Sequence, residues 1–212
     1  MPLCSQVRPC SPPLVIVGPE SLMRKDIEVF ISMRYRSAFG ATIRDFHPYF
    51  IVSFDRHQNI QFACGFRGAH LPLHLEQYLE TPAEVMLGEL LQASVCRDQL
   101  VEIGQLATFS IAQAPHLFLA VAELLLARGF KWAMVTATGP LWALFKRCGM
   151  HPLTLSGASL ESLPTDEATL WGNYYHHRPR VLGADLSLMA TQLRQTLQPE
   201  LGVIGDVIDG QN

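Results

Sequence analysis

Apolar residues recur along the first part of the chain in two different periods, which predict a strand followed by a helix. The run Leu14 to Val17, closed by Gly18 and Pro19, is typical of a buried strand. Apolar residues then recur at helical spacing from Met23 to Ala38, behind Ser21 as a candidate cap and ahead of Gly40 as a stop. The chain therefore opens with a strand and a helix.

A hairpin and a helical segment follow. The β-rich runs 49–54 and 60–66 are separated by five polar residues, which predicts two antiparallel strands. Between residues 70 and 97 the apolar spacing becomes helical, and Pro82 divides this segment into two short helices, with the proline in the first turn of the second. This segment is either a packing layer or a wall against an apolar substrate.

The second half alternates strands and helices with short connections. Strands are predicted at 100–109, 131–138 and 151–155, with helices starting at Pro115 and at Gly139 between them. Strand, helix, strand in this order implies parallel strands with right-handed crossovers. Combined with the hairpin, the pattern predicts an α/β fold with a mixed central sheet flanked by helices.

The end of the chain is less regular, with a loop around Pro164 and a terminal helix predicted over 182–197. We expect one domain over 14–198, a flexible N-terminal tail over 1–13 and a flexible C-terminal tail over 199–212. At 212 residues and 49% hydrophobic content, the chain is long enough to bury a core of that size.

Charge and cysteine content exclude several classes of protein. A net charge of -3 gives no overall basic field to attract nucleic acid. Five cysteines without a C-x-x-C pair favour reduced thiols in a cytoplasmic protein over disulfides or a zinc site. The most apolar run, 117–127, contains Glu123 and is far shorter than the roughly 20 residues of a membrane span.

The sequence LVEIGQLATF, residues 100–109, is the most informative strand. Gly104 interrupts its alternation, and a glycine inside a strand often marks a bulge that frees backbone hydrogen-bonding groups. Glu102 and Gln105 place a carboxylate and an amide beside that opening. We interpret this strand as the centre of an active site.

The order of elements has the layout of the GNAT acyltransferase fold, in which a bulged strand splays away from its parallel neighbour. Five blocks, RYRSAFGATIRDFHP, LHLEQYL, VEIGQLA, WAMVTAT and WGNYY, resemble the thermostable hemolysin family and cover residues 34 to about 175. The resemblance implies that the predicted strands 101–109 and 131–138 are parallel and splay apart beside Gly104.

The chain also resembles, more distantly, the acyl-homoserine-lactone synthases. Their Glu-x-x-Arg motif on the bulged strand is matched by Glu102 but not by Gln105, and their V-T-x-T strand is matched by residues 135–138. Arg67 is the candidate for an arginine on the preceding strand. The missing arginine puts S-adenosylmethionine as the acceptor in doubt.

The donor side departs from the usual GNAT pattern, because SIAQAPH replaces the glycine-rich, basic pyrophosphate loop. The residues expected to contact an acyl-CoA or acyl-carrier-protein thioester are Leu106, Ala107, Thr108, Ser110, Gln113 and His116. The helix N-terminus there can also bind phosphate. With fewer diphosphate contacts available, acyl-carrier protein becomes an alternative to CoA.

Acyl transfer to an amine requires a base, an oxyanion donor and orientation of both partners. We expect Glu102 to act as the base and the N–H freed near Gly104 to bind the carbonyl; the alternative for Glu102 is a salt bridge to Arg67 or Arg97. The residues expected to bind the acceptor are Arg34, Arg67, Tyr78, Gln105, Thr136 and Thr138. Surface charge remains the alternative for Arg34, and exposed strand positions for the two threonines.

His176 and His177 point apart on any regular element, and no third ligand stands at motif spacing, so no metal is expected. His47, His116 and Cys148 carry no specific signal. The prediction is a GNAT-like N-acyltransferase that moves a medium or long acyl chain from acyl-CoA or acyl-carrier protein to a small, amino-acid-like amine. The alternatives are a membrane-active hemolysin-like protein and a noncatalytic GNAT-like binding module.

Overall fold

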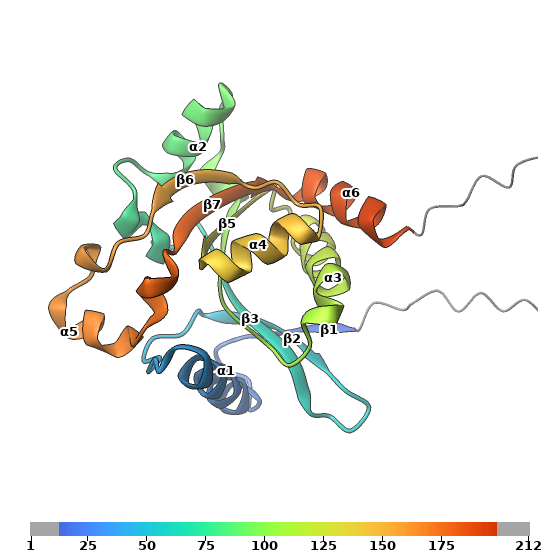
Figure 1. The fold of residues 1–212 in the computed structure, drawn as a ribbon. Coiled ribbons are helices and arrows are strands. Elements are labelled where there is room, and N and C mark those ends of the chain that lie inside the picture. The colour runs from blue at the N-terminus through green and yellow to red at the C-terminus, as the bar shows by residue number, and fades with distance from the viewer. Residues whose placement is uncertain (1–12, 199–212) are drawn as a thin grey trace, which may run out of the picture.

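A computed structural model describes residues 13–198 of the chain (Figure 1). The predicted tails therefore lie outside the described residues, apart from Pro13. Within the described part, one sheet of seven strands has the order β1-β2-β3-β4-β5-β7-β6. The strands are β1 (Leu14–Val17), β2 (Tyr49–Phe54), β3 (Ile60–Gly68), β4 (Leu100–Thr108), β5 (Trp132–Ala137), β6 (Leu153–Gly157) and β7 (Arg180–Asp185).

Helices cover both faces of this sheet. The α-helices are α1 (Arg24–Phe39), α2 (Ala83–Leu91), α3 (Ala114–Leu126), α4 (Gly139–Arg147), α5 (Thr165–Ala168) and α6 (Leu186–Leu197). The short 3-10 helices are η1 (His74–Tyr78), η2 (Arg97–Gln99), η3 (Ile111–Gln113), η4 (Leu160–Ser162), η5 (Thr169–Trp171) and η6 (Tyr174–His177). The predicted alternation of strands and helices and the mixed α/β sheet are confirmed.

Local signals account for most of the helix ends. Gly40 ends α1 with a left-handed φ of 66°, as its position predicts. The expected cap at Ser21 is displaced: α1 begins at Arg24, and the Ser21 hydroxyl accepts the Met23 N–H at 3.3 Å, ahead of the helix. Pro82 lies immediately before α2 rather than inside its first turn.

The C-terminal strand differs from the sequence prediction. Residues 182–197 do not form one helix, because β7 occupies Arg180–Asp185 and α6 begins only at Leu186. Asp185 separates the two elements: its carboxylate accepts the N–H groups of Ser187 and Leu188 at 2.8 and 3.0 Å, which is an N-cap. β7, which the sequence analysis did not predict, therefore ends at Asp185, and aspartate is one of the residue types that commonly cap the start of a helix.

This strand also changes the predicted βαβ unit. β4 and β5 pair in parallel, as expected, but β7 inserts between β5 and β6 and is antiparallel to both. β6 thus runs in the same direction as β5 without pairing with it. It also starts at Leu153, two residues later than predicted.

The bulge on β4 is present, but its centre is Gln105 rather than Gly104. Gly65 pairs with Gly104 and Ala63 with Ala107, so β4 holds one residue more than β3 over this interval. Gln105 takes the left-handed conformation, with φ of 53°. The extra residue reverses the alternation of side chains, so Leu106 joins the face of Ile103.

The predicted splay between the two parallel strands is confirmed. Pairing of β4 with β5 runs from Leu100–Trp132 to Ile103–Val135 and stops there. Beyond that point β4 continues along β3 as far as Thr108, while β5 continues along β7. A split therefore opens between β4 and β5 directly after Ile103.

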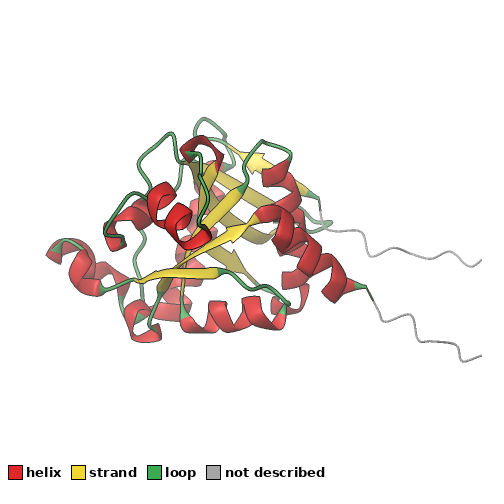
Figure 2. Ribbon diagram, turned by 90° about the horizontal axis from the view of Figure 1, so that it is seen from above, coloured by secondary structure: helices red, strands yellow, loops and turns green. Residues whose placement is uncertain are grey.

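The two faces of the sheet are covered by different helices (Figures 1 and 2). Ile27, Phe30 and Ile31 of α1 are buried against β1, β2 and β3 on one face. On the other face α3 and α6 pack on the sheet and on each other, with Leu125 of α3 and Ala190 of α6 buried in the same cluster. Glu102 lies on the α1 face of β4, and Ile103 on the opposite one.

Candidate active site

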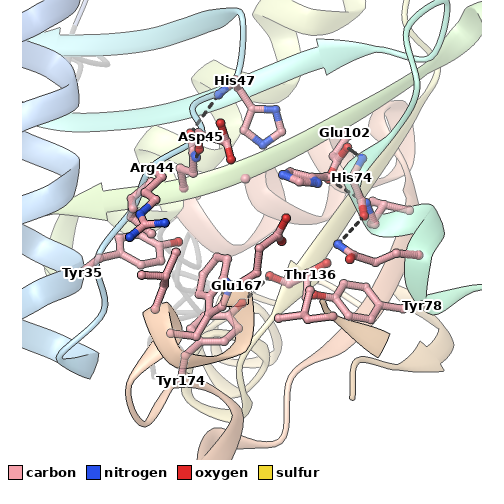
Figure 3. Close-up of a pocket in the computed structure, with 18 of the residues that line it drawn as sticks. Tyr35, Arg44, Asp45, His47, His74, Tyr78, Glu102, Thr136, Glu167 and Tyr174 are labelled. Atoms are coloured by element: carbon pink, nitrogen blue, oxygen red, sulfur yellow. Dashed lines mark hydrogen bonds between the residues drawn. The ribbon is translucent and has the colours of Figure 1, made fainter. Parts of the chain in front are cut away.

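A polar pocket opens on the α1 face beside the split (Figure 3). Its walls come from β4, β5, η1, the segment that leads from α1 into β2, and the segment that contains α5, η5 and η6. Predicted site residues that line it are Tyr78, Glu102, Gly104, Gln105 and Thr136. The fold therefore gathers five of the expected residues around one cavity.

Glu102 is the buried carboxylate of this pocket, with 4% of its surface exposed. Its two oxygens accept the backbone N–H groups of His74 at 2.7 Å and Leu75 at 3.1 Å, at the start of η1. Burial raises the pKa of Glu102 to about 7, against the opposing effect of these hydrogen bonds and of Arg67. A carboxyl group that titrates near neutrality can both take up and return a proton.

The alternative of a salt bridge to Glu102 is met by Arg67 and not by Arg97. Arg67 Nε lies 3.9 Å from Glu102 Oε2, and both side chains are largely buried. Arg97 does not reach Glu102, because its guanidinium is held at 2.6 Å by each of two other carboxylates, Glu76 and Glu84. Glu102 therefore has one distant cationic neighbour and two direct backbone donors.

Arg67 makes its closest side-chain contact with a histidine that carried no specific sequence signal. Its Nε donates to Nδ1 of His47 at 3.1 Å, and its Nη1 donates to the carbonyl of Pro72. His47 is 3% exposed. Burial, together with the charge of Arg67 and the neighbouring His74, lowers the pKa of His47 to about 3. The imidazole of His47 is therefore neutral at physiological pH.

Position 104 has no room for a side chain, because the imidazole of His47 occupies the space where a Cβ would be. Its backbone is not in the left-handed region that favours glycine. A Cβ at Gly104 would lie 2.5 Å from His47 Nε2. A Cβ at Gly65, which pairs with Gly104 between β3 and β4, would lie 2.7 Å from both Cβ and Cδ2 of the same side chain. The two glycines form the seat of His47.

Gln105 holds the segment that carries His47. Its side-chain oxygen accepts the His47 N–H at 3.1 Å, and its amide nitrogen donates to the Asp45 carbonyl at 2.6 Å. Gln105 lines the pocket, as expected for an acceptor-binding residue, yet both ends of its amide already have backbone partners. Its observed role is to join the bulge of β4 to the chain before β2.

Aromatic side chains form the wall opposite Glu102. The hydroxyls of Tyr78 and Tyr175 lie 2.6 Å apart, and the Tyr174 hydroxyl donates to the carbonyl of Thr136 at 3.4 Å. The ring of Trp171 packs on Tyr174 at a centroid distance of 5.0 Å. Apart from Tyr78 and Thr136, these residues were not predicted to belong to the site.

Three charged side chains around the pocket were also not predicted: Arg44, Asp45 and Glu167. Figure 3 shows Glu167 reaching from the α5 segment into the middle of the cavity. Its charge acts to raise the pKa of His74, although burial and Arg67 lower that pKa overall. No local motif marks these three residues, because loops far apart in sequence bring them together.

An apolar cavity lies on the other face of the sheet. Phe118 of α3, Phe145 of α4 and Met189 of α6 line it, together with Leu106 from the bulge. Ile103 borders both this cavity and the polar pocket. The two cavities therefore lie on either side of the point at which β4 separates from β5.

The remaining predicted residues lie outside the polar pocket. Ala107 is buried under α1, and the Thr108 hydroxyl accepts the Ser110 N–H at 3.2 Å. Ser110 and Gln113 lie along the connection from β4 into α3, and His116 lies in the first turn of α3. Arg34 stacks on Phe109 of the same connection, 4.9 Å from the ring centre, and Thr138 is buried at the start of α4.

Across residues 13–198, no three His, Cys, Asp or Glu side chains are placed to hold a metal ion together. In the same part of the chain, no helix combines the length and the apolar character that a membrane crossing requires.

Comparison with known families gives a match over residues 17–189 to the family described as thermostable hemolysin. No curated protein sequence matches the chain. Several solved structures share its fold. The AHL synthase LasI is 14% identical with a TM-score of 0.53, and the alignment covers 82% of this chain and 91% of LasI.

Two other structures align over a similar length. FeeM, an N-acyl amino acid synthase from uncultured soil microbes, is 13% identical with a TM-score of 0.57 over 88% of this chain and 98% of FeeM. BjaI, a CoA-dependent acyl-homoserine lactone synthase with SAM and isopentyl-CoA bound, is 9% identical with a TM-score of 0.56 over 88% of this chain and 90% of BjaI. At these identities the likeness establishes a common fold.

Proposed function

The chain belongs to the thermostable hemolysin family, and we propose that it is an N-acyltransferase that moves a medium or long acyl chain from a thioester to an amine. The thioester is carried by CoA or by acyl-carrier protein. The amine belongs to a small, amino-acid-like acceptor. The free thiols of Cys64, Cys96 and Cys148 suit the reducing cytoplasm as the setting of this reaction.

One observation carries this proposal: a polar pocket and an apolar cavity meet at Ile103, where the pairing of β4 with β5 ends. The acceptor amine fits the polar pocket, next to Glu102. The acyl chain fits the apolar cavity, and the thioester lies in the split between the two strands. This arrangement brings the amine and the thioester together at one point, while the rest of the acceptor and the acyl chain lie on opposite faces of the sheet.

Glu102 supplies the proton transfers. The amine nitrogen attacks the thioester carbon, the new C–N bond forms as the carbonyl electrons move to oxygen, and a proton leaves the nitrogen for Glu102, directly or through water. The C–S bond then breaks, and the departing thiolate takes the proton from Glu102. A pKa of about 7 suits both transfers, because the ionised and protonated forms are then nearly equal in energy.

The comparisons support the reaction class. LasI and BjaI are described as acyl-homoserine lactone synthases, and FeeM as an N-acyl amino acid synthase. BjaI holds isopentyl-CoA, which supports a thioester donor in a fold of this kind. We therefore assign the split of this chain to the donor and the pocket around Glu102 to the amine.

The donor's carrier group would leave the split beside the connection from β4 into α3. Ser110 and Gln113 lie there, and Arg34 stacks on Phe109 at the same connection. We therefore assign Arg34 to the donor side of the site rather than to the acceptor side, where its guanidinium, stacked on Phe109, can still donate to a phosphate.

A mass-spectrometric screen tests the proposal. Octanoyl, decanoyl and dodecanoyl thioesters, each carried on CoA and on acyl-carrier protein, would be incubated with a panel of amino acids and small amines. We expect an N-acylated product with wild type and with Glu89→Gln, which alters an exposed carboxylate on α2, and a severe loss with Glu102→Gln. Thioester binding without any product would instead favour a noncatalytic module.

A membrane-active protein is the second candidate, because the family name suggests it and α1 exposes apolar side chains. Met33 of α1 is 59% exposed and Val29 is 49% exposed, while Leu22 just before the helix is 97% exposed. Dye release from phosphatidylcholine and phosphatidylglycerol vesicles tests this function. Release by wild type that is lost in Leu22→Ser with Met33→Ser, and kept in Glu102→Gln, would favour it.

A further inference from the structure

His47 is placed to take part in the proposed reaction. Its ring sits in the seat formed by Gly65 and Gly104, and Gly104 is the last residue of β4 before the bulge. We propose that the Nε2–H of His47 donates a hydrogen bond to the thioester carbonyl oxygen as it becomes an oxyanion. The inference rests on the proposed acyl transfer and adds a side-chain donor to the backbone N–H near Gly104.

The tautomer of His47 follows from its partner. Arg67 Nε donates to Nδ1 at 3.1 Å, and a guanidinium does not lose its protons in a protein. Nδ1 must therefore be the acceptor nitrogen of the ring. In a neutral imidazole the single proton is then on Nε2.

The Nε2–H has no competing acceptor, since no hydrogen bond joins it to any of the described residues. The ring lines the polar pocket while only 3% of the residue is exposed. Nε2 stands directly over Gly104, where the Cβ of any other residue would be. The donor therefore lies in the polar pocket over Gly104, one residue from the start of the split, without a protein partner among the described residues.

Three contacts fix the ring before any ligand binds. Arg67 holds Nδ1, Gln105 holds the backbone N–H of His47, and the paired glycines leave a slot between β3 and β4. A donor that is already oriented stabilises a developing charge without paying for reorientation during the reaction. Such an arrangement is what an oxyanion donor needs.

A role as general base fits His47 poorly. The lone pair on Nδ1 is already occupied by Arg67, and Nε2 carries the proton. The charged and titratable groups around it are Arg67, His74, Asp45 and Glu102, and the pKa of His47 is lowered to about 3. Glu102 thus remains the proton acceptor, while His47 keeps its proton throughout the cycle.

Nitrogen NMR on the full chain tests the tautomer and the contact. We expect His47 to show a protonated Nε2 and a bare Nδ1 from pH 5 to 8. The probes are two nonreactive donors, S-(2-oxononyl) and S-nonyl thioethers, each on CoA and on acyl-carrier protein. The Nε2–H proton should shift downfield with the oxo compound and remain unchanged with the matched compound that lacks a carbonyl.

Each result decides a different question. Absence of binding by all four probes would remove the proposed function, and the inference would fall with it. Binding without a carbonyl-dependent shift would overturn the role of His47 alone, as would a proton on Nδ1. Binding with the shift would support both.

Two matched variants provide the kinetic test, once the screen has supplied a substrate pair. His47→Gln keeps a side-chain N–H at nearly the reach of Nε2, whereas His47→Asn keeps an acceptor for Arg67 but is too short to reach the split. Loss of one oxyanion donor lowers kcat by about 100- to 1,000-fold. We expect that loss for His47→Asn with an unchanged KM, and at most about a tenfold loss for His47→Gln.

Thermal unfolding controls for the fold. Equal losses of kcat in the two variants at similar unfolding temperatures would overturn the assignment. Only His47→Gln keeps an N–H that reaches the split, so equal losses would mean that this N–H does not matter for the reaction. A rise in KM with kcat unchanged would overturn it as well, since that result indicates ground-state binding only.

Discussion

At the scale of single residues, Glu102 is the group on which the proposed chemistry depends. Glu102→Gln keeps the shape of the side chain and one acceptor oxygen for η1, but it removes the base. We expect kcat to fall by about two to four orders of magnitude, the usual contribution of a general base, with the fold intact. Steady-state kinetics beside circular dichroism measure both, and unchanged turnover would make Glu102 structural.

The raised pKa of Glu102 sets the pH dependence. The ionised form accepts the proton, so kcat/KM should increase about tenfold per pH unit below 7 and level off above an apparent pKa of about 7. His47, with its pKa lowered to about 3, adds no further inflection between pH 5 and 8. A pH profile of kcat/KM checks this, and an inflection at 4.5 would show that the base titrates as an ordinary carboxyl group, which would contradict the raised pKa of Glu102.

The same shift affects stability, with a definite sign. The folded-state pKa of Glu102 lies above its ordinary value of 4.5, so its protonated form favours folding. The contribution is fully present below pH 4.5 and is lost as the pH rises through about 7. Glu102→Gln does not titrate, so we expect wild type to lose stability relative to this variant between pH 5 and 8 in urea unfolding experiments.

At the scale of elements, the bulge of β4 depends on Gln105, whose backbone is held in an unfavourable left-handed conformation. Its φ of 53° is unfavourable for a residue with a Cβ, and its amide joins the bulge to Asp45 and His47. Gln105→Ala and Gln105→Gly both remove the amide, but only glycine relieves the backbone. We expect Gln105→Gly to be more stable than Gln105→Ala by about 1 kcal/mol.

Urea unfolding of the two variants measures this difference. If the alanine variant were as stable as the glycine variant, the left-handed conformation at 105 would not be a feature of the folded chain.

Elements that depend on short-range pattern could be predicted from the sequence. The hairpin of β2 and β3, helix α3 after its proline, and the parallel pair β4 and β5 follow from spacing and from glycine and proline signals. β7 could not be separated from α6 in this way, because its apolar run continues into the helical one. Only the Asp185 cap divides them.

Of the predicted residues that line the pocket, three lie on β4, and Tyr78 and Thr136 come from η1 and β5. Glu102 and Gln105 were found because they flank Gly104 on β4, and the split was predicted from the resemblance to the GNAT fold. His47, Glu167 and Tyr174 approach that strand from other parts of the chain, and their contacts form only on folding. The resemblance blocks included His47 and Tyr174 without indicating what they do, and Glu167 lies outside all five blocks.

At the scale of the whole molecule, the choice of donor should show in the response to salt. Acyl-carrier protein would be recognised through its acidic helix by basic residues at the surface. The candidates are Arg34 and Arg36 on α1, and Lys146 and Arg147 on α4. Arg34 and Lys146 are each already stacked on an aromatic ring, of Phe109 and Trp142, which leaves Arg36 and Arg147 as the freer charges.

Exposed charges are screened over about 8 to 10 Å at ordinary ionic strength. We therefore expect kcat/KM with an acyl-carrier donor to fall markedly between low and high salt, while kcat/KM with acyl-CoA changes less. Arg36→Gln with Arg147→Gln should weaken only the former. A preference for acyl-CoA, without salt dependence for the carrier protein, would exclude the carrier as the donor.

The insertion of β7 between β5 and β6 has a consequence for biosynthesis. When a ribosome has released the chain only as far as β6, both β5 and β6 present open edges to the space that β7 later fills. Open strand edges pair readily with other chains. The two edges stay open until residues 180–185 emerge, so we expect the chain translated beyond β6 but not yet through β7 to be the form most in need of a chaperone.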